Sequence, residues 1–138
     1  MKETCLKVSI SSFSYKKGIP EDHSGNGGGF IFDCRCIPNP GIYEEYKQLT
    51  GMDIEVKEFL EKNETTIIFS SHIHSIVSIA VERYIEREFT HLMVNFGCTG
   101  GQHRSVYFAE TLSLYLHKQY PCVEIQVNHR EQNIQKIV

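Results

Sequence analysis

The sequence predicts an α/β domain: a small, mixed, partly parallel sheet of about four strands with helices packed on it. Two observations indicate this class. Short stretches of alternating apolar residues, typical of half-buried strands, are separated by longer stretches with helical periodicity. In addition, the apolar run 92–96 leads through a glycine-rich turn into a helical pattern at 102–118 and then into another alternating stretch. A strand–helix–strand unit of this kind favours right-handed, parallel pairing.

Four stretches have the pattern of a strand. Residues 6–13 alternate apolar and polar side chains, which predicts a half-buried strand. The stretch 30–37 predicts a second strand, and the prolines that follow it end it. The run 92–96 is apolar on both faces and predicts a central strand with helices on both sides. The alternation at 123–128 predicts the last strand.

Three further stretches have helical character before the central strand. We expect a short helix over 42–49, another over 54–62 with Asp53 as its N-cap, and a long helix over 64–88. The glycine-rich stretch 18–29 predicts a mobile loop. The apolar stripe of the long helix is broad, so we expect that helix to be well buried; its residues are Phe69, Ile73, Ile76, Val77, Ala80, Val81, Tyr84 and Ile85.

Length and composition exclude several classes of protein. A chain of 138 residues predicts one domain, residues 1–138. With 14 basic and 17 acidic residues the net charge is −3, so no general attraction to nucleic acid or an anionic membrane is expected. The five cysteines lack disulfide-framework or zinc spacing and no signal peptide precedes them, which favours a reducing cytoplasm and no metal. No apolar run approaches the roughly 18 residues that span a bilayer.

The strand–turn–helix at 92–118 predicts an anion site suited to phosphate. The first N–H groups of a helix have no intrahelical partner, and the helix dipole adds partial positive charge there. Paired glycines at 100–101 let the backbone approach a ligand, and Arg104 adds a bidentate donor. The alternative is an ordinary strand-to-helix turn, which explains the glycines but not the neighbouring Cys98, Thr99 and His103.

Asp33 and Arg35 are two residues apart in a predicted strand, so their side chains point to the same face. Two interpretations explain them equally well. One is a structural ion pair, and the other is a polar site at the carboxyl end of a strand.

The spacing of Cys98 and Arg104, followed by Ser105, resembles the C-x5-R-S/T loop of cysteine-dependent phosphatases. That resemblance implies Cys98 as nucleophile, Arg104 as oxyanion holder and Asp33 as the candidate general acid. Those enzymes have His immediately before the Cys, where this chain has Gly97. A cysteine phosphatase is therefore the catalytic alternative to a binding function, and the binding function is preferred.

A second resemblance covers nearly the whole chain. The segments 32–40, 49–53, 97–107 and 129–130 are similar, in that order, to the C-terminal domain of the RapZ family of RNase adapter proteins. The resemblance implies that the domain binds glucosamine 6-phosphate and forms homo-oligomers. In enterobacterial relatives it implies the delivery of a regulatory small RNA to an endoribonuclease that controls amino-sugar synthesis.

We therefore expect a regulatory domain that binds a phosphorylated amino sugar and needs no cofactor. The turn 99–104 would hold the phosphate, basic residues from elsewhere would add charge, and one carboxylate would accept a hydrogen bond from a sugar hydroxyl or ammonium. The expected ligand-binding residues are Ser12, Asp33, Arg35, Cys98, Thr99, Gly100, Gly101, Gln102, His103, Arg104, His129 and Arg130.

The chain also departs from the pattern of that family. Full-length relatives begin with a P-loop domain, but nothing here matches G-x-x-x-x-G-K-[ST], so nucleotide binding by that route is not expected. RNA-binding members end in a basic cluster, whereas residues 131–138 hold one lysine. An RNA-binding adapter remains a third alternative, with RNA bound weakly and the signal passed through a protein partner.

Overall fold

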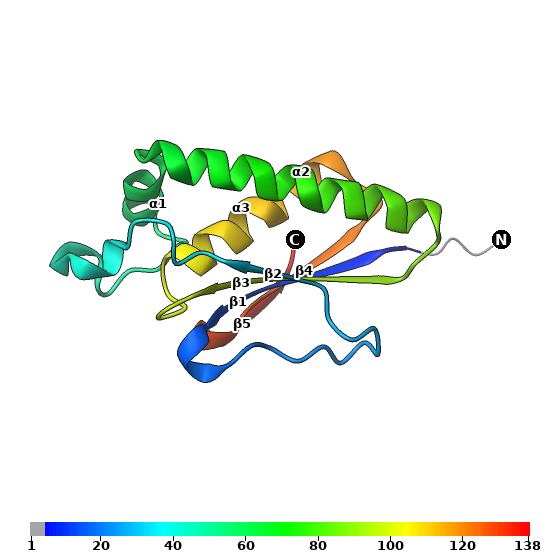
Figure 1. Cartoon of the computed structure of the whole chain (residues 1–138), viewed down its shortest axis with the longest axis horizontal. Coiled ribbons are helices and arrows are strands. Elements are labelled where there is room, and N and C mark those ends of the chain that lie inside the picture. Colours follow the sequence, from blue (N-terminus) through cyan, green and yellow to red (C-terminus); the bar gives the residue numbers. More distant parts are fainter. Residues whose placement is uncertain (1–4) are drawn as a thin grey trace.

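In the computed structural model, which describes residues 5–138, three α-helices pack on one face of a five-stranded sheet (Figure 1). The strand order is β2-β3-β1-β4-β5; β1 to β4 run parallel, and β5 pairs antiparallel with β4. The predicted α/β class is confirmed, with five strands instead of about four. The strands are β1 (Lys7–Ser14), β2 (Phe30–Asp33), β3 (His91–Cys98), β4 (Glu124–His129) and β5 (Ile134–Ile137). The helices are α1 (Ile54–Glu61), α2 (Glu64–Glu86) and α3 (Arg104–Gln119).

The prediction that helices cover both faces of the central strand is wrong, and the order of the strands explains why. From β2 to β3 and from β3 to β4 the chain moves in the same direction across the sheet. Right-handed connections that step in one direction place their helices on one face. The connection from β1 to β2 steps the other way, and its loop lies across the opposite face (Figure 1).

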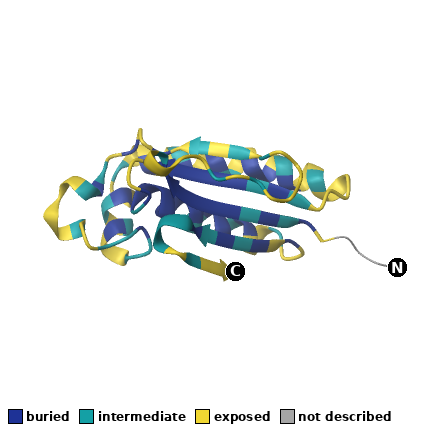
Figure 2. Cartoon of the chain, turned by 90° about the horizontal axis from the view of Figure 1, so that it is seen from below, coloured by how far each residue is buried: buried dark blue, intermediate teal, exposed yellow. Residues whose placement is uncertain are grey.

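The core lies between this helical layer and the sheet. Alternate residues of the central strands, such as Val8, Ile10, Val94 and Phe96, are at most 1% exposed. Figure 2 looks onto the opposite face and shows that buried residues are concentrated in the central strands. Burial of apolar area at about 25 cal/mol per Å² is the main stabilising contribution here.

The long helix is less buried than its apolar composition predicts. It spans Glu64–Glu86, close to the expected 64–88, but Ile76 is 45% and Ile85 37% exposed. The reason is that a two-layer fold covers only one side of each helix. None of the described helices is long and apolar enough to cross a membrane.

Two predicted elements differ from the structure, and one strand of the structure was not predicted. The strand expected over 30–37 ends at Asp33, and the chain then turns. The helix expected over 42–49 is replaced by two short 3-10 turns, Pro40–Ile42 and Glu44–Tyr46. The fifth strand lacks an alternating pattern, so it was not predicted; Asn133, in the left-handed region at φ 57°, reverses the chain into it.

Candidate functional site

The parallel strands end at one edge of the sheet, and the predicted anion turn lies at that edge. Ser14, the last residue of β1, pairs with Cys98, the last residue of β3, and Asp33 of β2 pairs with Gly97. The chain continues through residues 99–103 into α3, which begins at Arg104. In open α/β sheets ligands bind at the carboxyl ends of the strands, so the location fits the expected site.

The two glycines of the turn have different roles. Gly101 has φ 67°, and a Cβ there would lie 2.7 Å from both the backbone nitrogen of Ser14 and Cγ of Glu131. Only glycine meets both conditions without strain. A Cβ on Gly100 would have no atom within 4 Å, so this exposed glycine leaves the backbone open to a ligand.

The backbone N–H groups of residues 99–104 indicate an anion-binding site. None of them donates a hydrogen bond to another residue in the described part of the chain. Ser105 is the first residue of this segment whose N–H has a partner, at 3.4 Å from Sγ of Cys98. Free donors at the start of a 16-residue helix, with the helix dipole behind them, favour a negatively charged ligand.

Arg104 is buried, with only 5% of its surface exposed. Its Nη1 donates to the carbonyl oxygens of Arg35 at 3.0 Å and Ile37 at 2.9 Å, while its buried Nε has no partner among the described residues. No carboxylate of residues 5–138 forms a salt bridge with it. Burial of a guanidinium without a carboxylate partner costs free energy. The position of Arg104 therefore predicts that an anionic ligand binds beside it.

A cavity of about 360 Å³ opens beside this turn. None of its lining residues is acidic, and two exposed lysines that the sequence analysis missed, Lys16 and Lys47, join Arg104. Lys47 also lies 3.2 Å from a carboxylate oxygen of Glu44. The lining residues are Lys16, Asn39, Gly41, Lys47, Cys98, Thr99, Gly100, Gln102, His103 and Arg104. Lys16 follows the end of β1, and the carboxyl ends of parallel strands meet at one edge of the sheet, so its sequence position could have suggested that it joins the site. No sequence pattern indicated that Lys47 lies there.

Gln102 and His103 line the cavity, but the amide nitrogen of Gln102 and Nε2 of His103 are hydrogen-bonded to the protein itself. The amide of Gln102 donates to the carbonyl oxygens of Lys47 and Leu49, each at 2.7 Å, and Nε2 of His103 lies 2.8 Å from that of Tyr46. In a helix over 42–49 these three carbonyls would belong to the last turn, where carbonyl groups have no intrahelical partner, so they would be open to such donors there as well. The two residues therefore fasten this segment over the turn.

Cys98 lines the same cavity, although it is only 2% exposed. Its thiol donates to Oγ of Ser105 at 3.1 Å, and the N–H of Ser105 donates to the sulfur. The cysteine, arginine and serine of the C-x5-R-S motif are thus brought together around one turn.

Ser12 and His129 are buried away from this cavity, in the interface between the sheet and α3. Nδ1 of His129 lies 2.7 Å from Oγ of Ser12, and Nε2 lies 2.7 Å from Oε2 of Glu110. Burial raises the pKa of Glu110, but its bonds with His129 and Lys136 outweigh this and hold the pKa below the usual range. The Ser–His–Glu order resembles a hydrolytic triad, yet Ser12 and His129 are 0% exposed, so no substrate reaches the hydroxyl.

The other expected charges are neutralised locally and do not line the cavity. Arg35 forms a bidentate pair with Asp33, with Nη2 2.8 Å from Oδ2, and lies over the ring of Tyr15. Hydrogen bonding to Arg35 lowers the pKa of Asp33 below its usual value. Of the two interpretations of Asp33 and Arg35, the structure shows the ion pair. Arg130 likewise pairs with Glu131 at 2.9 Å and donates to the carbonyl oxygen of Gly18.

Glu131 supports the turn from behind, and this gives a pH dependence. Burial raises its pKa, but bonds from the N–H of Ser14 and from Arg130 outweigh burial, so the pKa lies below its usual value. A carboxylate with a depressed folded-state pKa stabilises the fold above its unfolded pKa, and the stabilisation is lost as pH falls through the folded pKa. The free energy of unfolding should therefore fall from about pH 5 downward.

In denaturant titrations, Glu131→Gln should be about 1–2 kcal/mol less stable than the parent at neutral pH and should lose less stability on acidification. The matched control is Glu86→Gln, whose carboxylate pairs with Arg83 on the exposed face of α2. An acid profile of Glu131→Gln that parallels the parent would contradict the prediction.

A comparison with known protein families finds a match that includes both the parallel strands of the sheet and the turn 99–104. The family model described as the RapZ C-terminal domain matches residues 6–133. The chain belongs to the RapZ C-terminal domain family. Within this RapZ-type domain, segment 32–40 supplies the carbonyls that Arg104 binds, and Gly51 of segment 49–53 donates its N–H to the carbonyl of Gln102. Three of the four segments that carry the resemblance therefore meet at the turn, whereas His129 and Arg130 do not line the cavity.

Curated relatives are similar over nearly the whole RapZ-type chain. A nucleotide-binding protein of Fervidobacterium nodosum is 39% identical over 130 residues, which cover 94% of this chain and 43% of the relative. Proteins of the same name from Polynucleobacter asymbioticus and Nitrosomonas europaea are 39% and 41% identical and are covered to 44% and 41%. The chain thus spans less than half the length of the curated relatives it matches.

Proposed function

We propose that this RapZ-type domain is a regulatory domain that binds a phosphorylated sugar at the turn 99–104, with glucosamine 6-phosphate as the ligand that the family resemblance suggests. The observation that carries the proposal is the buried Arg104, which has an unpartnered Nε and no carboxylate partner within residues 5–138. A phosphoryl group offers oxygens that accept hydrogen bonds from a guanidinium and from free backbone N–H groups.

The phosphate should supply most of the affinity. Lys16, Lys47 and Arg104 all favour an anion, whereas no carboxylate lines the cavity to receive an ammonium group, and Asp33 is paired with Arg35. The remaining polar groups, such as the exposed Thr99, suit sugar hydroxyls. Selection of the amino sugar would then depend on fewer contacts than recognition of the phosphate does.

Isothermal titration calorimetry with four compounds tests whether the phosphate supplies most of the affinity. Glucosamine 6-phosphate and glucose 6-phosphate should both bind, inorganic phosphate should compete with them, and glucosamine should give no heat of binding. Binding of glucosamine alone, or no binding of either sugar phosphate at roughly millimolar concentration, would overturn the proposal.

Substitution of Lys16 distinguishes a specific contact in the cavity from the general effect of the protein's net charge. Lys16→Ala should lower the affinity for sugar phosphate about fivefold, because an exposed lysine contributes about 1 kcal/mol to a charged contact. Lys118→Ala removes the same charge near the end of α3 and should leave affinity within about twofold. Equal losses in the two variants, measured by calorimetry at one salt concentration, would show that only net charge matters.

A cysteine-dependent phosphatase is the second candidate, because Ser105 contacts the sulfur of Cys98 at the cavity wall. In that case Cys98→Ser would abolish hydrolysis of a simple substrate such as p-nitrophenyl phosphate. We rank binding first and expect no hydrolysis above the buffer rate, with Cys98→Ser retaining affinity for sugar phosphate. Hydrolysis by the parent that is lost in this variant would reverse the ranking.

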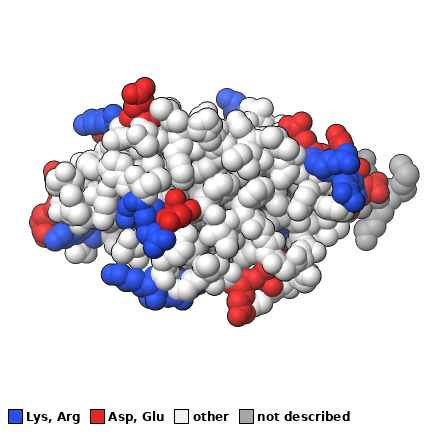
Figure 3. Space-filling view, in the orientation of Figure 1, with Lys and Arg blue, Asp and Glu red and all other residues white. Residues whose placement is uncertain are grey.

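Interaction with RNA is proposed to be weak for this chain. Its net charge is −3, and the face shown in Figure 3 has scattered basic and acidic side chains without a continuous basic surface. Affinity for a nucleic-acid backbone depends on several basic contacts and falls steeply with salt. Homo-oligomer formation, a protein partner and a cytoplasmic location remain proposals from the family resemblance and the free cysteines. A gel-shift titration at physiological salt tests RNA binding, and analytical ultracentrifugation tests homo-oligomer formation.

A further inference from the structure

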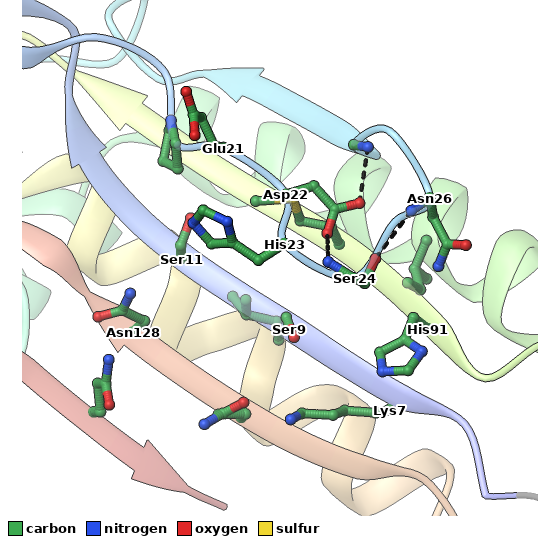
Figure 4. Close-up of a pocket in the computed structure, with 17 residues that line it drawn as sticks. Lys7, Ser9, Ser11, Glu21, Asp22, His23, Ser24, Asn26, His91 and Asn128 are labelled. Atoms are coloured by element: carbon green, nitrogen blue, oxygen red, sulfur yellow. Dashed lines mark hydrogen bonds between the residues drawn. The ribbon is translucent and has the colours of Figure 1, made fainter.

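A second cavity, of about 390 Å³, lies on the sheet face opposite to the helices, at a distance from the strand ends that form the anion site (Figure 4). Its floor is formed by β1, β3, β4 and β5, and its wall by the loop 20–28. From its glycine-rich sequence this loop is predicted only to be mobile. No residue of this cavity lines the anion cavity.

The centre of the floor is a set of neutral polar side chains held in register, and Lys7, His91 and Met93 line the rest of it. Ser11 pairs with Asn128, and Asn128 pairs with Gln135. Ser9 and Gln126 form the next row along β1 and β4. Because side chains alternate between the faces of a strand, all of these project to the face without helices.

The loop is held over this floor by its own contacts. The carboxylate of Asp22 accepts the N–H groups of Ser24 at 2.8 Å and Gly28 at 2.9 Å, as the dashed lines in Figure 4 show. A Cβ on Gly29 would lie 2.1 Å from the carbonyl oxygen of Met93, so only glycine lets the loop approach β3 this closely. The wall of the cavity is therefore pre-organised.

The side-chain amides that line the cavity are uncommitted, whereas the hydroxyl of Ser11 donates to Oδ1 of Asn95 and the ring of His91 is hydrogen-bonded to Thr90. Within residues 5–138, the side-chain amides of Asn26, Gln126, Asn128 and Gln135 make no hydrogen bond to protein. Gln126 and Asn128 are only partly exposed. Each amide offers two donor hydrogens and one acceptor oxygen. The charged lining residues are few and of mixed sign, namely Lys7, Glu21 and Asp22.

We propose that this cavity is a binding site for an uncharged, polyhydroxylated molecule, that is, a saccharide. A sugar hydroxyl both donates and accepts, which matches amide and hydroxyl side chains, and the mixed charges give no preference for an anion. The aromatic rings that line the cavity are the imidazoles of His23 and His91, and no Phe, Tyr or Trp is among its lining residues, so a nucleobase would find only a small stacking surface. The proposal is independent of phosphate binding at residues 99–104.

Amide chemical-shift mapping by ¹⁵N–¹H NMR tests it with glucose, N-acetylglucosamine and the disaccharide chitobiose as probes. Each probe that binds should shift resonances of residues 9–11, 22–28 and 126–128, whereas inorganic phosphate should shift those of 99–105. Asn128→Ala should weaken saccharide binding about fivefold. Gly29→Ala should weaken it further by displacing the loop. Gln119→Ala, which removes an exposed amide at the end of α3, should have no effect.

Three results would overturn the proposal: no saccharide-induced shifts at up to roughly 50 mM, shifts confined to 99–105, or a stronger response of the same resonances to uridine or phosphate. The spectrum of each variant reports folding directly, so loss of the fold would not be mistaken for loss of binding. Asn128 lies on the outer face of the sheet, outside the core between sheet and helices. Failure here would leave the phosphate site untouched.

Discussion

Replacement of Arg104 by methionine is expected to lower the affinity for sugar phosphate by roughly 10- to 100-fold, because charged hydrogen bonds contribute about 1.5–3 kcal/mol. Methionine keeps much of the buried volume but removes the charge. Without ligand, two effects oppose each other: the carbonyls of Arg35 and Ile37 lose a donor, and an uncompensated buried charge disappears. We therefore expect the free energy of unfolding to change by no more than about 2 kcal/mol.

Calorimetry and thermal unfolding with and without phosphate separate these effects. Saturating ligand should raise the Tm of the parent but not that of Arg104→Met. Arg35→Met is the informative control, because Arg35 is paired with Asp33 and does not line the cavity. It should retain affinity within about threefold. Unchanged affinity in a folded Arg104→Met variant would remove the central support for the phosphate site.

Gly101→Ala is expected to lower the free energy of unfolding by about 2–5 kcal/mol. The left-handed φ of 67° costs roughly 1–2 kcal/mol for a residue with a Cβ. The methyl group would also meet the backbone of Ser14 and the side chain of Glu131, and overpacking of this kind costs about 1–3 kcal/mol.

The neighbouring Gly100→Ala provides a matched comparison, because its Cβ would meet nothing within 4 Å and its φ is not positive. It should change stability by less than about 1 kcal/mol in urea denaturation. It should nevertheless weaken phosphate binding, since the methyl group narrows the approach to the free N–H groups. Equal stabilities of the two variants would show that the turn does not have the described conformation.

The sequence alone determined the features that depend on near neighbours in the chain. Apolar alternation placed β1 and β4, a continuous apolar run placed β3, and helical periodicity placed α1, α2 and α3, because a strand or helix repeats over a few residues. The glycine turn could be predicted for the same reason, and the helix expected from residue 102 begins at Arg104. The predicted residues of the turn, from Cys98 to Arg104, line one cavity in the structure, apart from Gly101, which supports the turn from within; their role in ligand binding stays a prediction.

Only the tertiary structure decided which residues distant in the chain lie beside that turn and which do not. Lys16 and Lys47 reach the cavity from segments more than 50 residues away along the chain, whereas Ser12 and His129 are enclosed by α3. Strand order, which no local pattern encodes, placed every helix on one face of the sheet and left the other free for the loop 20–28. The physical reason is that burial, charge pairing and the direction of a crossover depend on contacts between segments, and a pattern of neighbouring residues contains no information on those contacts.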